Sequence, residues 1–135
     1  MNEDELIALA QQARNQAYAP YSRFYVGAAL LTKSSRIFRG ANVENASFGL
    51  TMCAERVCVG GAIEAGEREF ELLAIVTEGD VPTLPCGACR QVLAQFAPKL
   101  RIICATTKGQ REEYRLGDLL PRAGQGLPSF YVEHV

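Results

Sequence analysis

The chain has 135 residues, of which 48% are hydrophobic and 21% charged, the composition of one globular domain and not of a disordered or collagen-like chain. Its 14 basic and 15 acidic side chains give a formal net charge of -1, which argues against a nucleic-acid duplex as partner. The acidic start lacks the parts of a signal peptide, and no apolar run approaches the roughly 20 residues of a membrane span. We therefore expect one domain over residues 1–135, located in the cytoplasm, with no nucleic-acid or membrane partner.

The first predicted element is a helix over residues 4–17, where small and apolar side chains recur at helical spacing. Pro20 cannot continue this helix. Strands are predicted over residues 25–32 and 37–41, and the turn at residues 34–36 joins them into a hairpin.

The remaining predicted elements alternate between helices and strands. In order they are a loop at 42–47, a helix at about 52–65, a strand at 71–77, a loop leading into a short helix at 84–96, and a strand at 100–106. Residues 112–116 are a candidate last strand, and residues 117–121 a turn or short helix. This alternation indicates a layered α/β fold.

The cysteines carry the chemical signal. Five cysteines in a chain without a recognisable secretory signal favour metal binding or catalysis over a disulfide framework. Cys86 and Cys89 form a Cys-x-x-Cys pair at a predicted helix start, a spacing that is compatible with half of a zinc site, a thioredoxin-like redox pair or two buried thiols. Cys53 opens another predicted helix, so three thiols can converge from two helix N-termini, where the positive end of the helix dipole favours thiolate.

Three thiolates leave one corner of a tetrahedron open, as in catalytic zinc sites, and zinc lowers the pKa of water to about 7. Glu55 follows Cys53 by two residues, so it can lie beside the metal without binding it and act as a proton shuttle. Arg56 is placed to offset the negative charge of the thiolates.

A resemblance rests on these residues. Cys-Ala-Glu-Arg at 53–56, followed about thirty residues later by Pro-Cys-Gly-Ala-Cys-Arg-Gln at 85–91, resembles the cytidine deaminase family, specifically its small branch with cysteine ligands. Tyr-Ser-Arg-Phe-Tyr-Val-Gly-Ala-Ala at 21–29 and Asn-Val-Glu-Asn-Ala-Ser at 42–47 resemble the same family. The resemblance implies a three-layer α/β/α sandwich around a five-stranded mixed sheet, and a homotetramer.

The resemblance also implies a reaction and the residues that perform it. The reaction is the zinc-dependent hydrolytic deamination of cytidine and 2′-deoxycytidine to uridine and 2′-deoxyuridine, with release of ammonia. The implied zinc ligands are Cys53, Cys86 and Cys89, and the implied proton relay is Glu55. The implied substrate contacts are the ring of Phe24 against the base, the side chains of Asn42 and Glu44 on the ribose hydroxyls, and the backbone N–H of Ala54.

Two positions depart from the family pattern. Tyr25 stands where the family usually has proline, and Leu119-Leu120-Pro121 is followed by Arg122, Ala123 and Gly124 where an aromatic residue usually reaches a neighbouring subunit. This second departure puts base stacking shared between subunits in doubt, with Phe130 as a candidate replacement.

Two other functions compete with deamination of cytidine. The first is deamination of a modified cytosine nucleoside such as blasticidin S, but deaminases of that antibiotic lack the Asn-x-Glu pair that Asn42 and Glu44 form here. The second is a non-catalytic zinc module, which needs a fourth protein ligand. Cys58 lies five residues after Cys53, a spacing that turns it about 140° away on a helix, so we expect it to be a buried thiol outside the metal site.

Overall fold

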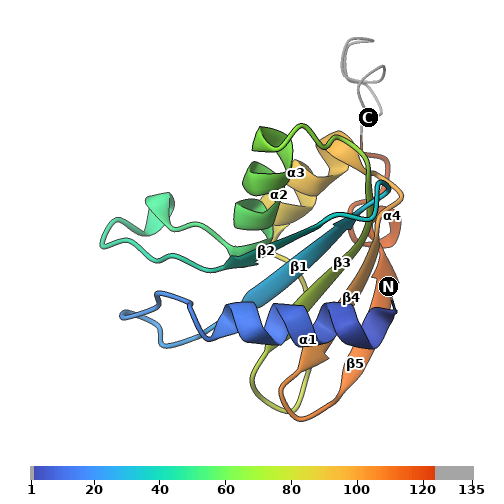
Figure 1. The fold of residues 1–135 in the computed structure, drawn as a ribbon. Coiled ribbons are helices and arrows are strands. Elements are labelled where there is room, and N and C mark those ends of the chain that lie inside the picture. Colours follow the sequence, from blue (N-terminus) through green and yellow to red (C-terminus); the bar gives the residue numbers. More distant parts are fainter. Residues whose placement is uncertain (1, 124–135) are drawn as a thin grey trace.

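The computed structural model describes residues 2–123, which form one five-stranded mixed sheet with helices on both faces (Figure 1). The strands lie in the order β2-β1-β3-β4-β5. Their bounds are Gly27–Thr32 for β1, Ile37–Ala41 for β2, Phe70–Thr77 for β3, Arg101–Thr106 for β4 and Arg111–Arg115 for β5. Strand β1 pairs antiparallel with β2 and β3, β3 pairs parallel with β4, and β4 pairs antiparallel with β5.

The helices make the two outer layers of the sandwich. Helix α1 (Glu3–Arg14) packs on one face of the sheet, whereas α2 (Ala54–Glu64) and α3 (Gly87–Phe96) pack on the other (Figure 1). The short helices η1 (Phe48–Leu50) and α4 (Leu116–Leu119) complete the described chain. The expected α/β/α sandwich around a mixed sheet is therefore confirmed.

The central strand β3 is covered on both faces, which explains its almost continuous apolar sequence. Leu73 and Ile75 belong to the core under α2 and α3, whereas Leu72, Ala74 and Val76 face α1. The side chains thus alternate between two cores, as the period of a strand requires.

Helix α1 has a well-formed start and an early end. The Asn2 side chain accepts a hydrogen bond from the backbone N–H of Glu5 at 2.8 Å, and acidic residues fill the first turn, where they complement the helix dipole. The predicted end at residue 17 is wrong, because the helix ends at Arg14. Beyond it the backbone N–H of Tyr18 donates to the Asn42 carbonyl at 2.9 Å, so a contact with a distant loop replaces further helical bonds.

The other predicted elements match the structure to within about three residues, and only the single turn η1 was not expected. Residues 111–115 form the last strand, and residues 116–119 the predicted short helix. Among the helices of residues 2–123, none combines the length and the apolar character needed to cross a membrane. Gly124 and Phe130 lie outside the described residues.

Candidate metal and substrate site

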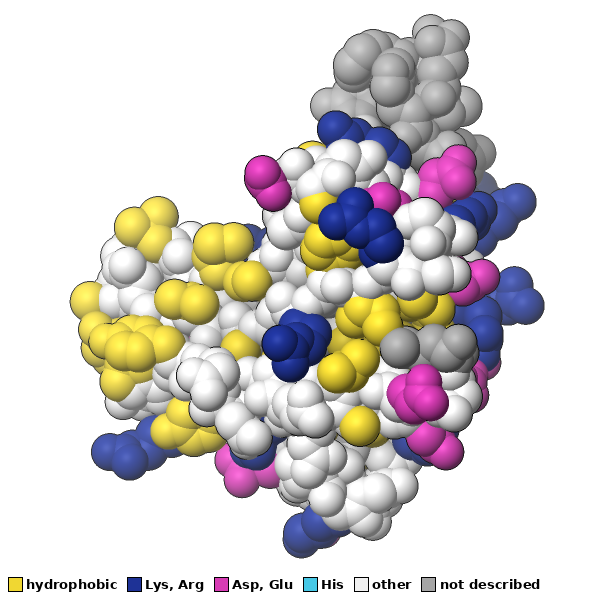
Figure 2. All heavy atoms as spheres, viewed as in Figure 1, with side chains coloured by type: hydrophobic (Ala, Val, Ile, Leu, Met, Phe, Trp, Pro, Cys, Tyr) yellow, Lys and Arg dark blue, Asp and Glu magenta, His cyan; other side chains and the backbone are white. Residues whose placement is uncertain are grey.

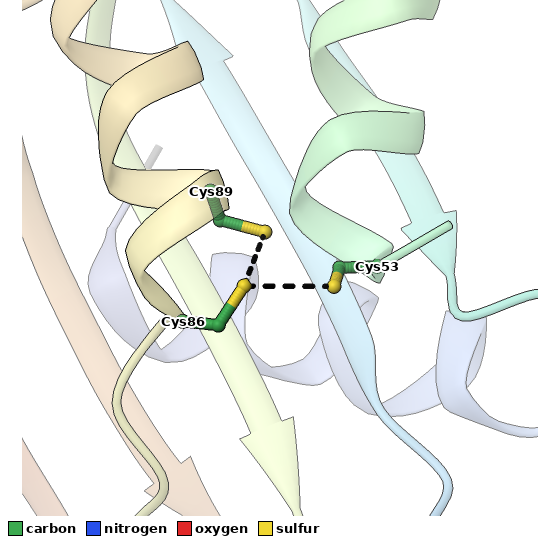
Figure 3. Close-up of side chains that lie close together, drawn as sticks. All are labelled: Cys53, Cys86 and Cys89. Atoms are coloured by element: carbon green, nitrogen blue, oxygen red, sulfur yellow. Dashed lines mark hydrogen bonds between the residues drawn. The ribbon is translucent and has the colours of Figure 1, made fainter. Parts of the chain in front are cut away.

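Three of the five cysteines meet where α2 and α3 begin (Figure 3). Cys53 is the N-cap residue of α2, Cys86 is the N-cap residue of α3, and Cys89 lies in the first turn of α3. The Sγ atom of Cys86 lies 3.8 Å from that of Cys53 and 3.5 Å from that of Cys89, and all three Sγ atoms are within 4.8 Å of one another.

The spacing of these thiols suits a tetrahedral metal. Zinc–sulfur bonds of about 2.3 Å place the sulfurs of a tetrahedral site about 3.8 Å apart, close to the separations here. Cys58 and Cys104 are fully buried and do not belong to the cluster. Three thiolates fit zinc as donors, and within residues 2–123 no fourth protein donor joins them, so one coordination position is left for another ligand, as in catalytic zinc sites.

Arg56 supports the thiolate form of Cys53. Its Nη2 donates to the Cys53 Sγ at 3.3 Å and to the Thr51 carbonyl at 3.2 Å. The pKa of the Cys53 thiol falls to about 5, because the neighbouring Cys89 thiol and then the Arg56 guanidinium stabilise the thiolate. The Nε of Arg56 is buried without a hydrogen-bond partner in the described chain.

Glu55 lies next to the thiols but is not one of the clustered donors. Its side chain belongs to the wall of a cavity shared with Cys53 and Cys86, and the residue is 4% exposed. Burial raises the pKa of the Glu55 carboxyl, because removal from water disfavours the charged form. A carboxyl in this position can take up and release a proton inside the cavity.

The cavity has a volume of about 190 Å³ and is open on one side. This volume is below the roughly 300–1,000 Å³ of pockets for drug-sized ligands and suits a single small ring. The wall contains two of the clustered cysteines, Glu55, three of the four substrate residues implied by the resemblance and several others: Phe24, Val26, Asn42, Thr51, Cys53, Ala54, Glu55, Ile75, Thr77, Thr83, Leu84 and Cys86. The structure thus brings Phe24, Asn42, Ala54 and Glu55 together with the thiols.

Asn42 and Glu44 are already engaged by the backbone of a neighbouring loop. The Asn42 side chain accepts from the Val26 N–H at 2.9 Å and donates to the Phe24 carbonyl at 2.8 Å. One N–H of its amide group is left for a further acceptor.

Glu44 is not part of the cavity wall. Its Oε1 accepts from the backbone N–H groups of Tyr21 and Ser22 at 3.0 and 3.1 Å, and its Oε2 accepts from the Ser22 hydroxyl. The Ser22 hydroxyl, more than any other group, lowers the pKa of the Glu44 carboxyl. Lone pairs remain on Oε2, so the carboxylate can still accept a further hydrogen bond.

Sequence reasoning did not single out Ser22, Thr77 or Thr83. Thr77 ends β3, is buried, and places its hydroxyl 3.4 Å from that of Thr83 beside the cavity. Ser22 was visible within the Tyr-Ser-Arg-Phe segment, but its role depends on a partner 22 residues away. No local pattern identifies such a partner.

Comparisons with known proteins agree with this geometry. Residues 1–106 match the family model described as the cytidine and deoxycytidylate deaminase zinc-binding region. The chain is 47% identical over 124 residues to a cytidine deaminase of Halalkalibacterium halodurans, an alignment covering 91% of this chain and 94% of that protein. It is 25% identical over 125 residues to a blasticidin-S deaminase of Bacillus cereus, covering 87% and 88% of the two chains.

A solved structure extends the likeness to three dimensions. The crystal structure of cytidine deaminase from Burkholderia pseudomallei superimposes with a TM-score of 0.88 at 48% identity, covering 91% of this chain and 99% of that one. The family model and the relatives span most of the chain, including the three thiols and Glu55. The chain therefore belongs to the cytidine and deoxycytidylate deaminase family.

Proposed function

We propose that this protein is a single-domain, zinc-dependent hydrolase that converts cytidine and 2′-deoxycytidine to uridine and 2′-deoxyuridine and releases ammonia. One observation carries the proposal: three clustered thiols have no fourth protein donor in the described chain, and two of them, Cys53 and Cys86, line a small cavity together with a buried carboxyl. An open metal position beside a proton carrier is what hydrolysis of an aromatic amine requires.

The residues divide the chemistry between them. Cys53, Cys86 and Cys89 hold zinc, which when bound makes hydroxide available near neutral pH by lowering the pKa of water to about 7. Glu55 accepts the proton of the attacking water and delivers it to N3 of the cytosine ring. A C–O bond forms at C4 as N3 is protonated. Glu55 then carries the second proton of the former water from the C4 hydroxyl to the amino group, the C4–N bond breaks, and ammonia leaves as the C4 carbonyl forms. Arg56 holds the Cys53 sulfur in its charged form throughout.

Substrate binding involves other residues of the cavity wall. The ring of Phe24 packs against the base, and the backbone N–H of Ala54, in the first turn of α2, is a free donor for it. The remaining N–H of Asn42 and the remaining lone pairs of Glu44 bind the ribose hydroxyls. Asn42 lines the cavity, and both side chains hold the loop that carries Phe24.

We also propose that the protein is a homotetramer in the cytoplasm, a compartment that keeps thiols reduced. Two loops project beyond the sheet, and Figure 2 shows hydrophobic side chains gathered over them. Phe48 is 79% exposed, Leu50 68% and Tyr18 57%. Apolar side chains gathered in this way are typical of an interface between subunits, and the two loops that carry them also carry Phe24 and Thr51 of the cavity wall. Light scattering that gives 14.7 kDa, the mass of one chain, in solution would exclude the tetramer.

The test is a panel of cytosine compounds, with ammonia release and zinc content measured on the same preparation. We expect about one zinc per chain, rapid turnover of cytidine and 2′-deoxycytidine within about tenfold of each other, and slow turnover of cytosine. Efficient turnover of cytosine contradicts the nucleoside assignment. Preference for blasticidin S supports the modified-nucleoside alternative, and zinc without any ammonia release supports the non-catalytic module.

Glu44→Ala sharpens this test. The substitution removes the proposed ribose contact, so kcat/KM for cytidine falls by about tenfold or more while activity on cytosine changes little and zinc stays bound. Equal losses on both compounds would show that Glu44 supports the fold and not the sugar.

A further inference from the structure

The aromatic wall of the cavity is carried by a loop with no helix or strand of its own. Residues 15–26, here named the N-terminal loop, connect α1 to β1, and residues 42–53, the central loop, connect β2 to α2. The two run side by side, joined by a backbone bridge between Tyr18 and Val43 (Figure 1). Phe24 lies in the N-terminal loop and is 38% exposed, so core packing alone does not determine where its ring lies.

Polar side chains hold both backbone groups of Phe24. Its N–H donates to the Ser22 hydroxyl oxygen at 3.0 Å, and its carbonyl accepts from the Asn42 amide at 2.8 Å. The Ser22 hydroxyl in turn donates to the Glu44 carboxylate. One hydroxyl therefore connects the residue that packs against the base with the carboxylate that binds the ribose.

The residue between Ser22 and Phe24 is strained. Arg23 has a φ of 57°, in the left-handed region that costs a residue with a side chain about 1–2 kcal/mol. Such a conformation persists only where surrounding contacts enforce it. Here the Ser22 hydroxyl spans Arg23 to reach the Phe24 N–H, and the Arg23 N–H donates to the Ala19 carbonyl at 2.9 Å.

We propose that Ser22 is a positioning residue for the deamination reaction: its hydroxyl fixes the Phe24 ring at the cavity wall and the Glu44 carboxylate at the sugar in one arrangement. The inference rests on the proposed function, in which Phe24 and Glu44 contact the nucleoside. Ser22 acts through these two residues and does not itself line the cavity.

Steady-state kinetics of three variants test the proposal. Ser22→Ala removes the hydroxyl, Ser22→Thr retains it, and Ser47→Ala is a matched control, because Ser47 is an exposed serine of the central loop whose hydroxyl makes no capping bond to η1. We expect KM for cytidine to rise about five- to tenfold in Ser22→Ala, with kcat within about twofold and zinc content unchanged. Ser22→Thr recovers most of the affinity, and Ser47→Ala behaves as the unmodified protein.

The split between KM and kcat separates positioning from folding. A purely structural role would lower kcat through loss of active protein and leave KM unchanged. If Ser22→Ala matches Ser47→Ala in KM, or if Ser22→Thr fails to restore it, the proposal is wrong. Absence of ammonia release from cytidine by the unmodified, zinc-loaded protein is a different result, since it rejects the proposed function itself.

A second measurement does not require turnover. The chain contains five tyrosines but no tryptophan, so Phe24→Trp introduces a single indole, which can be excited selectively, at the position in question. Adding Ser22→Ala to this variant should lower the fluorescence anisotropy of the indole and increase its quenching by acrylamide, whereas adding Ser47→Ala should change neither. Equal anisotropy and equal quenching in both double variants would overturn the inference, whatever the enzyme does to cytidine.

Discussion

The two walls of the cavity are built in different ways. The thiol wall is carried by the first turns of α2 and α3, and the residues behind it, Ala54, Cys58 and Leu93, are completely buried. The opposite wall is carried by the N-terminal loop, where Phe24 is 38% exposed and Ser22, Asn42 and Glu44 supply the hydrogen bonds that hold it.

The difference indicates how each wall responds to change. The thiols are placed by helices that pack on the sheet, so their geometry depends on the packing of the whole core. A change that disturbs this packing is therefore expected to displace the thiols together. The aromatic wall depends on a few exposed hydrogen bonds, each of which contributes a modest free energy. We therefore expect substitutions on the thiol wall to abolish activity. Substitutions on the wall formed by the N-terminal loop should each reduce the affinity for substrate only in part.

The largest effect is expected from loss of one thiol. Cys89→Ala leaves two thiolates, too few to retain zinc, so bound metal falls from about one per chain to about zero and activity disappears. Metal content after gel filtration is the measurement. Cys58→Ala is the control, because this buried thiol of α2 lies outside the cluster. A folded Cys58→Ala protein without zinc would instead support a structural site with four cysteines.

Glu55→Gln should separate chemistry from metal binding on the same wall. The amide cannot carry the proton, so kcat for cytidine falls by at least about 10²-fold. Zinc content and thermal stability stay near those of the unmodified protein, since Glu55 is not one of the clustered donors. Turnover close to normal in this variant would remove Glu55 from the mechanism.

Gly40→Ala tests whether the core places the thiol wall. A Cβ at Gly40 would lie 2.5 Å from the Ala54 carbonyl oxygen, so the first turn of α2 must move away from β2. We expect unfolding free energy to fall by about 1–3 kcal/mol in denaturant titrations, together with weaker zinc retention. Gly60→Ala, on the same helix, has nothing within 4 Å of its new Cβ and should raise stability by about 0.5–1 kcal/mol. If both variants retain zinc equally, core packing does not control the thiol wall.

The smallest effect is expected far from both walls, at Glu67. Its carboxylate accepts from the Ser34 hydroxyl at 2.6 Å and pairs with Arg36 at 3.2 Å. These contacts, the Ser34 hydrogen bond first, lower the pKa of Glu67 in the folded protein.

Because the pKa of Glu67 is lower in the folded than in the unfolded protein, its carboxylate stabilises the folded state fully at pH values above the unfolded pKa of about 4.3. This stabilisation is lost as the pH falls through the pKa of Glu67 in the folded protein. Unfolding of Glu67→Gln, followed by circular dichroism, should therefore show a small destabilisation at pH 7 that disappears in acid. Glu69→Gln, which removes an exposed carboxylate two residues away, is the control variant for this measurement. If Glu67→Gln remains equally destabilised at pH values below the pKa of Glu67 in the folded protein, the loss of stability is due to packing and not to charge.

The thiol wall could be predicted from the sequence and the loop wall only in part. Cys53 and Cys86 each precede a segment with helical periodicity, so local signals placed both at helix starts, and the structure brings their sulfurs to 3.8 Å. Phe24 and Asn42 were implied by resemblance to a family and lie at the cavity.

The hydrogen bonds of the loop wall have no local signature. Ser22 meets Glu44 only because two loops lie side by side, and the end of α1 at Arg14 depends on the same pairing. The contact of Gly40 with the Ala54 carbonyl is likewise set by how a helix crosses a strand. Helical and strand periodicities describe single elements, so they do not specify contacts between elements.

The placement of the thiols also has a consequence for the order of folding. Cys53 and Cys86 are 33 residues apart, with α2 and β3 between them, and after Cys86 the chain crosses through α3 to the strand β4, which pairs parallel with β3. Parallel pairing of this kind is non-local and forms slowly compared with a hairpin. No early, local fragment holds all three sulfurs, so we expect the nascent chain to acquire its metal late. A cell short of zinc would then accumulate a nearly native protein that lacks only its metal, and not an unfolded chain.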